Sequence, residues 1–353
     1  MKDRIKVGLL GATGVVGQRY VEMLESHPDF ELVALVGKSS AGKRYGEAAK
    51  WLLPTPIPEA FSDMVVREAG PTTVDECAVI FSALPSEAAI QLEPLYAKMG
   101  KAIVSEVSAH RMEPDVPLIV PEVNGDHLRL LEFQRKNRGW KKGLATTPNC
   151  TVTGLSVVLK ALADRFPIRK AVVTTMQAVS GAGYPGVSSL LILENVIPYI
   201  KDEEEKVERE SKKILGTVNG GSVKPFALPM AVSCNRVSTL DGHLETLYCE
   251  FDRAVTPAEA ESQLSGFRGE PQKLRLHTAP EAPIIVTKQK DRPQPRLDRL
   301  AGSVPGMSVV VGRVRPGLDD YSIRLTLLSH NTIRGAAGNA ILTAELMLRK
   351  GYL

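Results

Sequence analysis

Short apolar runs alternate with amphipathic segments through the first half of the chain. The segments between the runs, such as 18–26 and 86–99, carry apolar residues at the spacing of a surface helix. Strands that alternate with helices imply right-handed crossovers and a parallel sheet covered on both faces. The pattern therefore predicts a doubly wound α/β fold. The predicted strands are Ile5–Leu10, Leu32–Val36, Ala78–Ala83 and Ala102–Val107.

The second half has longer segments in which apolar and polar residues partly alternate. Such alternation is typical of strands with one buried face, which occur mainly in antiparallel sheets. We therefore expect two domains, a nucleotide-binding domain over 1–149 and an α+β domain with a mostly antiparallel sheet over 150–330. Strands are expected at 171–179, 243–251, 307–314 and 321–328, helices at 202–213, from Thr256 onward and at 331–348, and an irregular connection at 282–298.

Composition and charge narrow the functional class. Of 353 residues, 43% are apolar and 24% are charged, and a net charge of +4 is small for this length. No basic run with interleaved aromatic residues suggests a nucleic-acid interface, no stretch is apolar enough to cross a bilayer, and the first residues lack a signal-peptide core. Four widely separated cysteines fit neither a disulfide framework nor a zinc site. We expect a cytoplasmic protein without a metal, a nucleic-acid partner or a membrane partner. The cysteines are Cys77, Cys150, Cys234 and Cys249.

A glycine-rich loop, GATGVVG at 11–17, follows the first predicted strand and leads into the first predicted helix. Glycines in this setting let the backbone approach a pyrophosphate, and the helix N-terminus supplies N–H groups that bind it. The loop therefore predicts a Rossmann-like dinucleotide site.

The end of the second predicted strand indicates which dinucleotide binds. NAD sites usually place Asp or Glu there to hold the ribose 2′-hydroxyl. Here Val36 is followed by GKSSAGK at 37–43, which offers hydroxyls and cations but no carboxylate. This composition suits a 2′-phosphate, so NADP is the predicted cofactor. The alternative is that Lys38 and Lys43 are ordinary surface lysines.

Cys150, within TPNCT at 147–151, precedes apolar residues at helical spacing and is therefore expected at a helix N-terminus. Unpaired N–H groups and the helix dipole favour a thiolate there, and the same N–H groups could hold an oxyanion. Pro148 keeps the preceding residue extended, as a loop leading into a helix requires. The pentapeptide by itself leaves two interpretations open, a nucleophile and a small buried core residue.

A second cluster of chemically active residues lies in CNRVSTLDGHLE at 234–245. The Asp241-Gly242 turn would place His243 at the start of a strand, with Glu245 on the same side of the pleat. Histidine transfers protons near neutral pH, and Arg236 could bind a carboxylate with two hydrogen bonds. Taken singly, each of these residues could also be structural.

These motifs together resemble aspartate-β-semialdehyde dehydrogenase, specifically the archaeal and fungal branch of that family. The matching stretches cover nearly the whole chain in order, and the cysteine motif combined with the spacing from Arg236 to His243 is the most specific part. The stretches are 11–17, 40–43, 121–124, 148–151, 177–183, 236–243, 293–299 and 334–338.

The resemblance implies an NADP-dependent reduction of β-aspartyl phosphate to aspartate semialdehyde, a step in lysine, methionine and threonine biosynthesis. Cys150 would be the acyl-accepting nucleophile and His243 the acid/base, while Gln177 would position the acyl group and Arg236 would bind the substrate α-carboxylate. The resemblance implies further phosphate- or substrate-binding residues at Arg111, Asn149, Lys206 and Glu203.

The resemblance also implies that the final helix, 331–353, packs back on the nucleotide domain and that the chain forms a homodimer or homotetramer through a catalytic and dimerisation domain. The sequence departs from the branch at Ser39, where many members carry arginine. Two other functions remain as alternatives, a malonyl-CoA reductase of the same branch and a sensor that binds NADP without turnover. The implied cofactor-binding residues are Gly11, Thr13, Gly14, Val15, Val16, Ser39, Ser40, Lys43, Ser82, Ala83, Ser180, Gly181 and Asn331.

Overall fold

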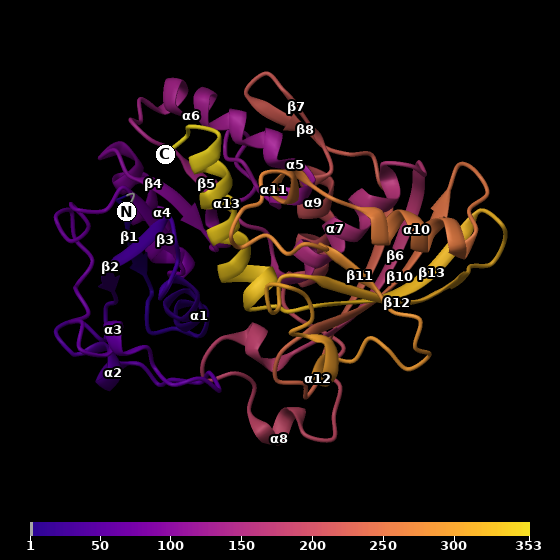
Figure 1. Cartoon of the computed structure of the whole chain (residues 1–353), viewed down its shortest axis with the longest axis horizontal. Coiled ribbons are helices and arrows are strands. Elements are labelled where there is room, and N and C mark those ends of the chain that lie inside the picture. Colours follow the sequence, from indigo (N-terminus) through magenta and orange to yellow (C-terminus); the bar gives the residue numbers. More distant parts are fainter. Residues whose placement is uncertain (1–2) are drawn as a thin grey trace.

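A computed structural model describes residues 3–353 and contains two main sheets, one formed by each half of the chain (Figure 1). The first sheet has the order β2-β1-β3-β4-β5, and all of its neighbouring strands run parallel. Its strands are β1 (Ile5–Leu10), β2 (Phe30–Val36), β3 (Val79–Ser82), β4 (Ala102–Ser105) and β5 (Leu144–Thr146).

Helices cover the first sheet and build its core. The main ones are α1 (Val15–Leu24), α4 (Ser86–Lys98), α6 (Leu130–Arg138) and the C-terminal α13 (Gly338–Arg349). Side chains of α13, such as Ile341, share one hydrophobic cluster with Val7 and Leu9 of β1. Figure 1 shows α13 beside the first sheet, although the other half of the chain separates the two in sequence.

The second sheet has the order β11-β12-β13-β10-β6-β9. Its three central pairs are antiparallel, and the pairs at the two edges, β11 with β12 and β6 with β9, are parallel. The predicted fold class, a Rossmann-like sheet plus an α+β domain, is therefore confirmed. The strands are β6 (Ile168–Gln177), β9 (Met230–Arg236), β10 (His243–Phe251), β11 (Ile284–Val286), β12 (Val309–Pro316) and β13 (Ser322–Ser329).

The helix α7 (Cys150–Ala163) packs on the inward face of this second sheet. Leu155 and Val158 of α7 share a cluster with Val173 of β6 and Leu247 of β10. The helices α9 (Glu203–Ile214) and α10 (Pro257–Gly266) flank α7, and α10 begins with the predicted Thr256 capping box.

Three local predictions differ from the structure. The first helix begins at Val15 rather than Gln18, so Gly17 belongs to its first turn. A Cβ at Gly17 would come within 2.4 Å of the Gly11 carbonyl oxygen. The predicted connection at 282–298 contains β11 and the short helix α12 (Pro295–Asp298). The last predicted helix is preceded by a π-type turn, Ile333–Ala337, that brings the backbone against Cys150.

Candidate active site

Cys150 is the first residue of α7, immediately after the loop that leaves β5. Asn149 caps the helix, because its side-chain oxygen accepts a hydrogen bond of 2.9 Å from the Thr151 N–H. Cys150 is partly exposed, whereas the other three cysteines are buried and unpaired. A Cβ at Gly335 would lie 2.8 Å from the Cys150 Cβ, so only glycine lets the π-type turn approach so closely. The predicted position of Cys150 at a helix N-terminus is confirmed.

Arg236, Gln177 and His243 form a row across three neighbouring strands of the second sheet. Gln177 of β6 is the register partner of Arg236 on β9, and the pairing of Met176 with Leu244 puts His243 beside Gln177. All three side chains of the row are buried. The sequence predicted the strand start at His243. It could not predict that His243 would lie beside Gln177, 66 positions earlier in the chain, because the strand order decides which residues become neighbours.

His243 meets Cys150 directly across the site. Its Nε2 lies 3.1 Å from the Cys150 Sγ, and its Nδ1 accepts a hydrogen bond of 3.1 Å from the Ala178 backbone N–H. Burial, together with the positive charge of Arg236 and with His330, lowers the pKa of His243 to about 3. The imidazole is therefore neutral at neutral pH.

Burial also dominates the thiol. It raises the pKa of Cys150 to about 12, with a further increase from Glu203, while Arg236, Arg111 and the Thr151 N–H act in the opposite direction. A raised pKa is the opposite of what we expected from the sequence, which predicted that the helix N-terminus would favour the thiolate. The helix terminus is present, but desolvation has the larger effect on the pKa of Cys150.

The side chains of Arg236 and Gln177 are held by hydrogen bonds at the end of β6. Arg236 donates through Nη1 to the Ala178 carbonyl oxygen at 2.7 Å, and Gln177 donates through Nε2 to the Thr175 Oγ1 at 3.2 Å. A Cβ at Gly181 would lie 3.0 Å from the Arg236 Nη1 and 3.2 Å from the His243 Cε1. The backbone of the loop after β6 therefore closes over both side chains.

Glu245 belongs to a second row directly behind the first. It is the register partner of Thr175 and is completely buried, and neither carboxyl oxygen has a hydrogen-bond partner within residues 3–353. Burial raises its pKa well above the ordinary value, and Glu203 adds to this effect. Burial therefore favours the uncharged form of this carboxyl group.

Helix α9 supplies the acidic groups around Asn149. Glu203 accepts a hydrogen bond of 2.9 Å from the Asn149 side chain, and Glu210 accepts one of 2.6 Å from the Asn149 backbone N–H. Arg111 pairs with Glu210 at 3.1 Å and lines the same cavity as Cys150. Lys206 is half-buried on α9 and does not line that cavity. Sequence reasoning missed Glu210, although its position seven residues after Glu203 puts both on one helix face.

A cavity of about 850 Å³ runs from the glycine loop to Cys150. Gly11 has φ of +80°, and a Cβ there would lie 2.4 Å from the Ala83 carbonyl oxygen. The position therefore requires glycine, both for its backbone conformation and for the close approach of the two segments. This cradle at the start of α1 suits a pyrophosphate.

All but two of the predicted cofactor residues line the cavity. The exceptions are Ser82, which is completely buried at the end of β3, and Lys43, which does not line the cavity, whereas Lys38 does. Sequence reasoning missed Glu106 and Thr332, because both reach the cavity from loops that carry no recognisable motif. The predicted residues that line it are Gly11, Thr13, Gly14, Val15, Val16, Ser39, Ser40, Ala83, Ser180, Gly181 and Asn331.

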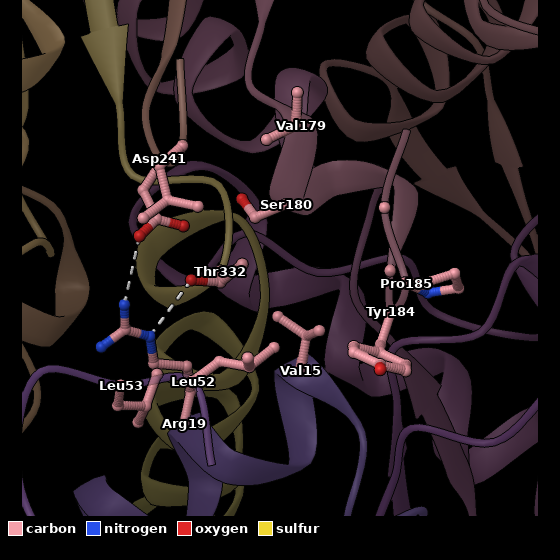
Figure 2. A pocket seen from close by; sticks show the side chains of 13 residues that line it. Val15, Arg19, Leu52, Leu53, Val179, Ser180, Tyr184, Pro185, Asp241 and Thr332 are labelled. Atoms are coloured by element: carbon pink, nitrogen blue, oxygen red, sulfur yellow. Dashed lines mark hydrogen bonds and ion pairs between the residues drawn. The ribbon is translucent and has the colours of Figure 1, made fainter. Parts of the chain in front are cut away.

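A smaller hollow of about 220 Å³ adjoins the cavity at Val15 and Ser180 (Figure 2). In it, Arg19 of α1 donates to the Thr332 hydroxyl at 3.2 Å and pairs with Asp241 at 3.5 Å. Asp241 precedes the strand that carries His243. These contacts therefore connect α1, which follows the glycine loop, to the segment that leads into β10.

The part of the chain that the structure describes contains no cluster of three or more His, Cys, Asp or Glu side chains that could hold a metal ion. Within residues 3–353, no helix is both long and apolar enough to span a membrane.

Comparisons with known proteins agree with this fold. The family model described as semialdehyde dehydrogenase, NAD binding domain, matches residues 6–131, and the model described as semialdehyde dehydrogenase, dimerisation domain, matches residues 159–334. The chain is 47% identical over 345 residues to aspartate-semialdehyde dehydrogenase of Methanothermobacter thermautotrophicus, covering 97% of this chain and 99% of that protein.

Two further relatives are informative. Malonyl CoA reductase (NADP) of Metallosphaera sedula is 41% identical over 355 residues, covering 100% of this chain and 99% of that protein. The crystal structure of aspartate semialdehyde dehydrogenase with NADP from Candida albicans matches with a TM-score of 0.89 at 40% identity, covering 99% of this chain and 100% of that one.

Proposed function

The chain belongs to the aspartate-semialdehyde dehydrogenase family, as its motifs predicted, and we propose that it converts β-aspartyl phosphate to aspartate semialdehyde with NADPH. Such a reaction serves the biosynthesis of lysine, methionine and threonine. The observation that carries the proposal is the contact of 3.1 Å between the Cys150 Sγ and the His243 Nε2, at the end of a cavity that begins at a dinucleotide loop.

The residues of the site divide the chemistry among them. The Cys150 sulfur attacks the acyl carbon, phosphate departs, and a thioester forms on the sulfur. NADPH held by the residues that line the cavity would supply the hydride that reduces the thioester to a thiohemiacetal, whose C–S bond then breaks to release the aldehyde. His243 is assigned the role of acid/base, which its Nε2 supports by lying 3.1 Å from the sulfur, and Ser180 and Gly181 line the cavity that contains Cys150.

Cations and amides around the sulfur fit an anionic substrate. Arg236 is assigned to the α-carboxylate and Gln177, its register partner, to the acyl oxygen. Arg111 and Asn149 line the cavity at Cys150 and are assigned to the phosphate side. Lys206 and Glu203 are assigned to phosphate and substrate on family resemblance; of the two, Glu203 contacts Asn149.

Replacement of Cys150 tests the proposal. Cys150→Ala should lower turnover on the order of 10⁴-fold or more, because it removes the nucleophile, and should leave NADP binding intact. Cys77→Ala is the matched control, since Cys77 is a buried thiol in the core of the first sheet, outside the site. Turnover is followed at the nicotinamide absorbance with aspartate semialdehyde, phosphate and NADP. Undiminished turnover in Cys150→Ala would refute the assignment.

A malonyl-CoA reductase is the second candidate, because one relative at 41% identity carries that name. Arg236 could bind a malonyl carboxylate as well as an aspartyl one. Parallel assays of malonyl-CoA with NADPH and of aspartate semialdehyde with phosphate and NADP decide between the two. A sensor without turnover has no need of the contact between Cys150 and His243, and rapid iodoacetamide labelling of Cys150 that substrate slows would exclude it.

The cofactor is NADP. Ser39, Ser40 and Lys38 line the cavity after β2, so hydroxyls and a cation are available for the 2′-phosphate. Lys38→Ala should raise the Kd for NADP more than the Kd for NAD, as measured by fluorescence titration. Equal effects on both would count against this role of the lysine.

The assembly, location and domain limits follow from the same reasoning. We infer a homodimer or homotetramer, supported by the match to a dimerisation domain, and a cytoplasmic location, supported by four unpaired cysteines. The proposed domains are 1–149 with the C-terminal segment 331–353, and 150–330. Their support is that α13 shares its core with β1 and that α7 shares its core with β6 and β10. Light scattering tests the oligomeric state.

A further inference from the structure

We propose that Lys213 of α9 is a positioning residue, which holds the backbone of one loop so that Arg111 on that loop can bind phosphate. The loop, residues 108–116, follows β4 of the first sheet. Lys213 donates three hydrogen bonds to backbone carbonyl oxygens of this loop. Only the role of Arg111 in binding phosphate rests on the proposed function.

The three hydrogen bonds use every donor that the lysine has. They reach the carbonyl oxygens of Arg111 at 2.7 Å, Glu113 at 2.8 Å and Val116 at 2.9 Å. An ammonium group has three N–H donors and no acceptor, so none is left for a substrate. Lys213 is only 5% exposed and does not line the cavity that contains Cys150. It can therefore act on the reaction only through the loop.

The helix α9 holds Arg111 at both ends. Lys213 binds its backbone carbonyl oxygen, and Glu210, three positions earlier on α9, accepts from its Nη1 at 3.1 Å. This spacing puts Glu210 and Lys213 on one face of the helix. The other terminal nitrogen of Arg111, Nη2, donates to the Glu106 carbonyl oxygen at 2.6 Å. The main chain and the side chain of Arg111 are thus both fixed.

The same helix face also contacts the segment that carries the nucleophile. One carboxyl oxygen of Glu210 accepts from Arg111, and the other accepts from the Asn149 backbone N–H at 2.6 Å. Asn149 directly precedes Cys150. A loop bound to α9 by Lys213 therefore keeps Arg111 in a defined place relative to the sulfur.

The charges around Lys213 favour a cation at this position. Burial lowers its pKa to about 8, although Glu113, Asp115 and Glu210 act in the opposite direction. The amine is therefore mainly protonated at neutral pH, and all three donors are present. Glu113 and Asp115 also pair with Arg138 on α6. An apolar side chain in place of Lys213 would remove a donor from three carbonyl oxygens, so the loop would rearrange to satisfy them.

Michaelis constants test whether Lys213 positions Arg111. Lys213→Met keeps the length of the side chain and removes the donors. With aspartate semialdehyde, phosphate and NADP as substrates, it should raise the KM for phosphate about tenfold and the KM for NADP by less than about twofold. A purely structural role would lower the melting temperature or kcat and leave the KM for phosphate unchanged, and that result would overturn the proposal.

Two further variants control this comparison. Lys212→Met is matched, because Lys212 is the neighbouring lysine on α9 and pairs with Glu208 instead; it should change neither KM by more than about twofold. Lys213→Arg keeps the charge, but a planar guanidinium cannot converge on three oxygens as an ammonium group does. It should raise the KM for phosphate less than Lys213→Met does, and if only this variant folds, an unchanged KM for phosphate would overturn the proposal.

A double-mutant cycle tests whether Lys213 acts through Arg111. The measured quantity is kcat/KM for phosphate, which initial slopes give even without saturation. In the Arg111→Met background, Lys213→Met should change this ratio by less than about twofold, because the side chain to be positioned is gone. An equal effect in both backgrounds would overturn the proposal.

Hydrogen exchange separates this proposal from the proposed function. In the free protein, without substrate or NADP, the backbone amides of residues 111–116 should exchange at least about tenfold faster in Lys213→Met than in the parent. Lys212→Met should leave these rates unchanged. Unchanged rates in Lys213→Met would overturn the role of Lys213, whereas a parent protein without turnover of aspartate semialdehyde would overturn only the proposed function.

Discussion

Glu106 provides a test of how burial of a carboxyl group changes the pH dependence of the stability of this fold. It lines the cofactor cavity, and its carboxyl oxygens accept hydrogen bonds from the Tyr20 hydroxyl at 2.8 Å and the Thr147 hydroxyl at 2.6 Å. These bonds connect α1 with the loop that precedes the candidate nucleophile. Burial raises the pKa of Glu106 from 4.5 to about 7, although both hydroxyls and Arg111 lower it.

The perturbation is Glu106→Gln, which keeps the shape and removes the titration. Because the folded state binds the proton more tightly than the unfolded state, the carboxyl contributes most stability below about pH 4.5. That contribution is lost as the pH rises to about 7. A difference of about 2.5 pKa units corresponds to at most about 3 kcal/mol, and the opening of the side chain to the cavity reduces this value.

The assay is urea unfolding of the two proteins without cofactor at a fixed protein concentration, at several pH values across this window. As the pH rises from about 4.5 to about 7, the free energy of unfolding of Glu106→Gln should increase by about 2–3 kcal/mol relative to that of the parent. Above this range, the difference between the two proteins should not change further. Glu205→Gln, on the exposed face of α9, is the control and should differ from the parent by less than about 0.5 kcal/mol at every pH. A difference for Glu106→Gln that does not change with pH would refute the reasoning.

Two more predictions concern contacts in the interior of the protein, where a small change of volume or charge has a large effect. Gly181→Ala should lower kcat about tenfold to a hundredfold with little change in melting temperature, because the new Cβ would come within 3.2 Å of the His243 ring and displace it; an unchanged kcat would contradict this. Glu122→Gln should lower the free energy of unfolding by about 3–5 kcal/mol, because Arg334, completely buried, then loses the negative charge that balances it. The same change at Glu270, in an exposed pair, should cost less than about 1 kcal/mol in the same denaturant titration, and equal losses would contradict the argument.

The sequence alone was sufficient where a short segment determines its own backbone. The glycine loop, the N-terminal position of Cys150, the strand start at His243 and the Thr256 capping box were all predicted correctly. Each depends on preferences that operate within one turn or one strand, so neighbouring residues carry the information. The parallel pairing in the first sheet and the fold class followed from the alternation of these segments.

Only the tertiary structure decided the ionisation of the site and the composition of its walls. The pKa of Cys150 and the pKa of His243 depend on burial and on Arg236, which lies more than 80 residues from Cys150 in the chain and on a different strand from His243. The same is true of the Ala178 N–H on the imidazole, of Glu210 on Asn149 and of the replacement of Lys43 by Lys38 in the cavity wall. Desolvation and Coulomb interactions act through space and depend on which strands become neighbours, so a local pattern can identify the chemical groups but cannot determine their charges.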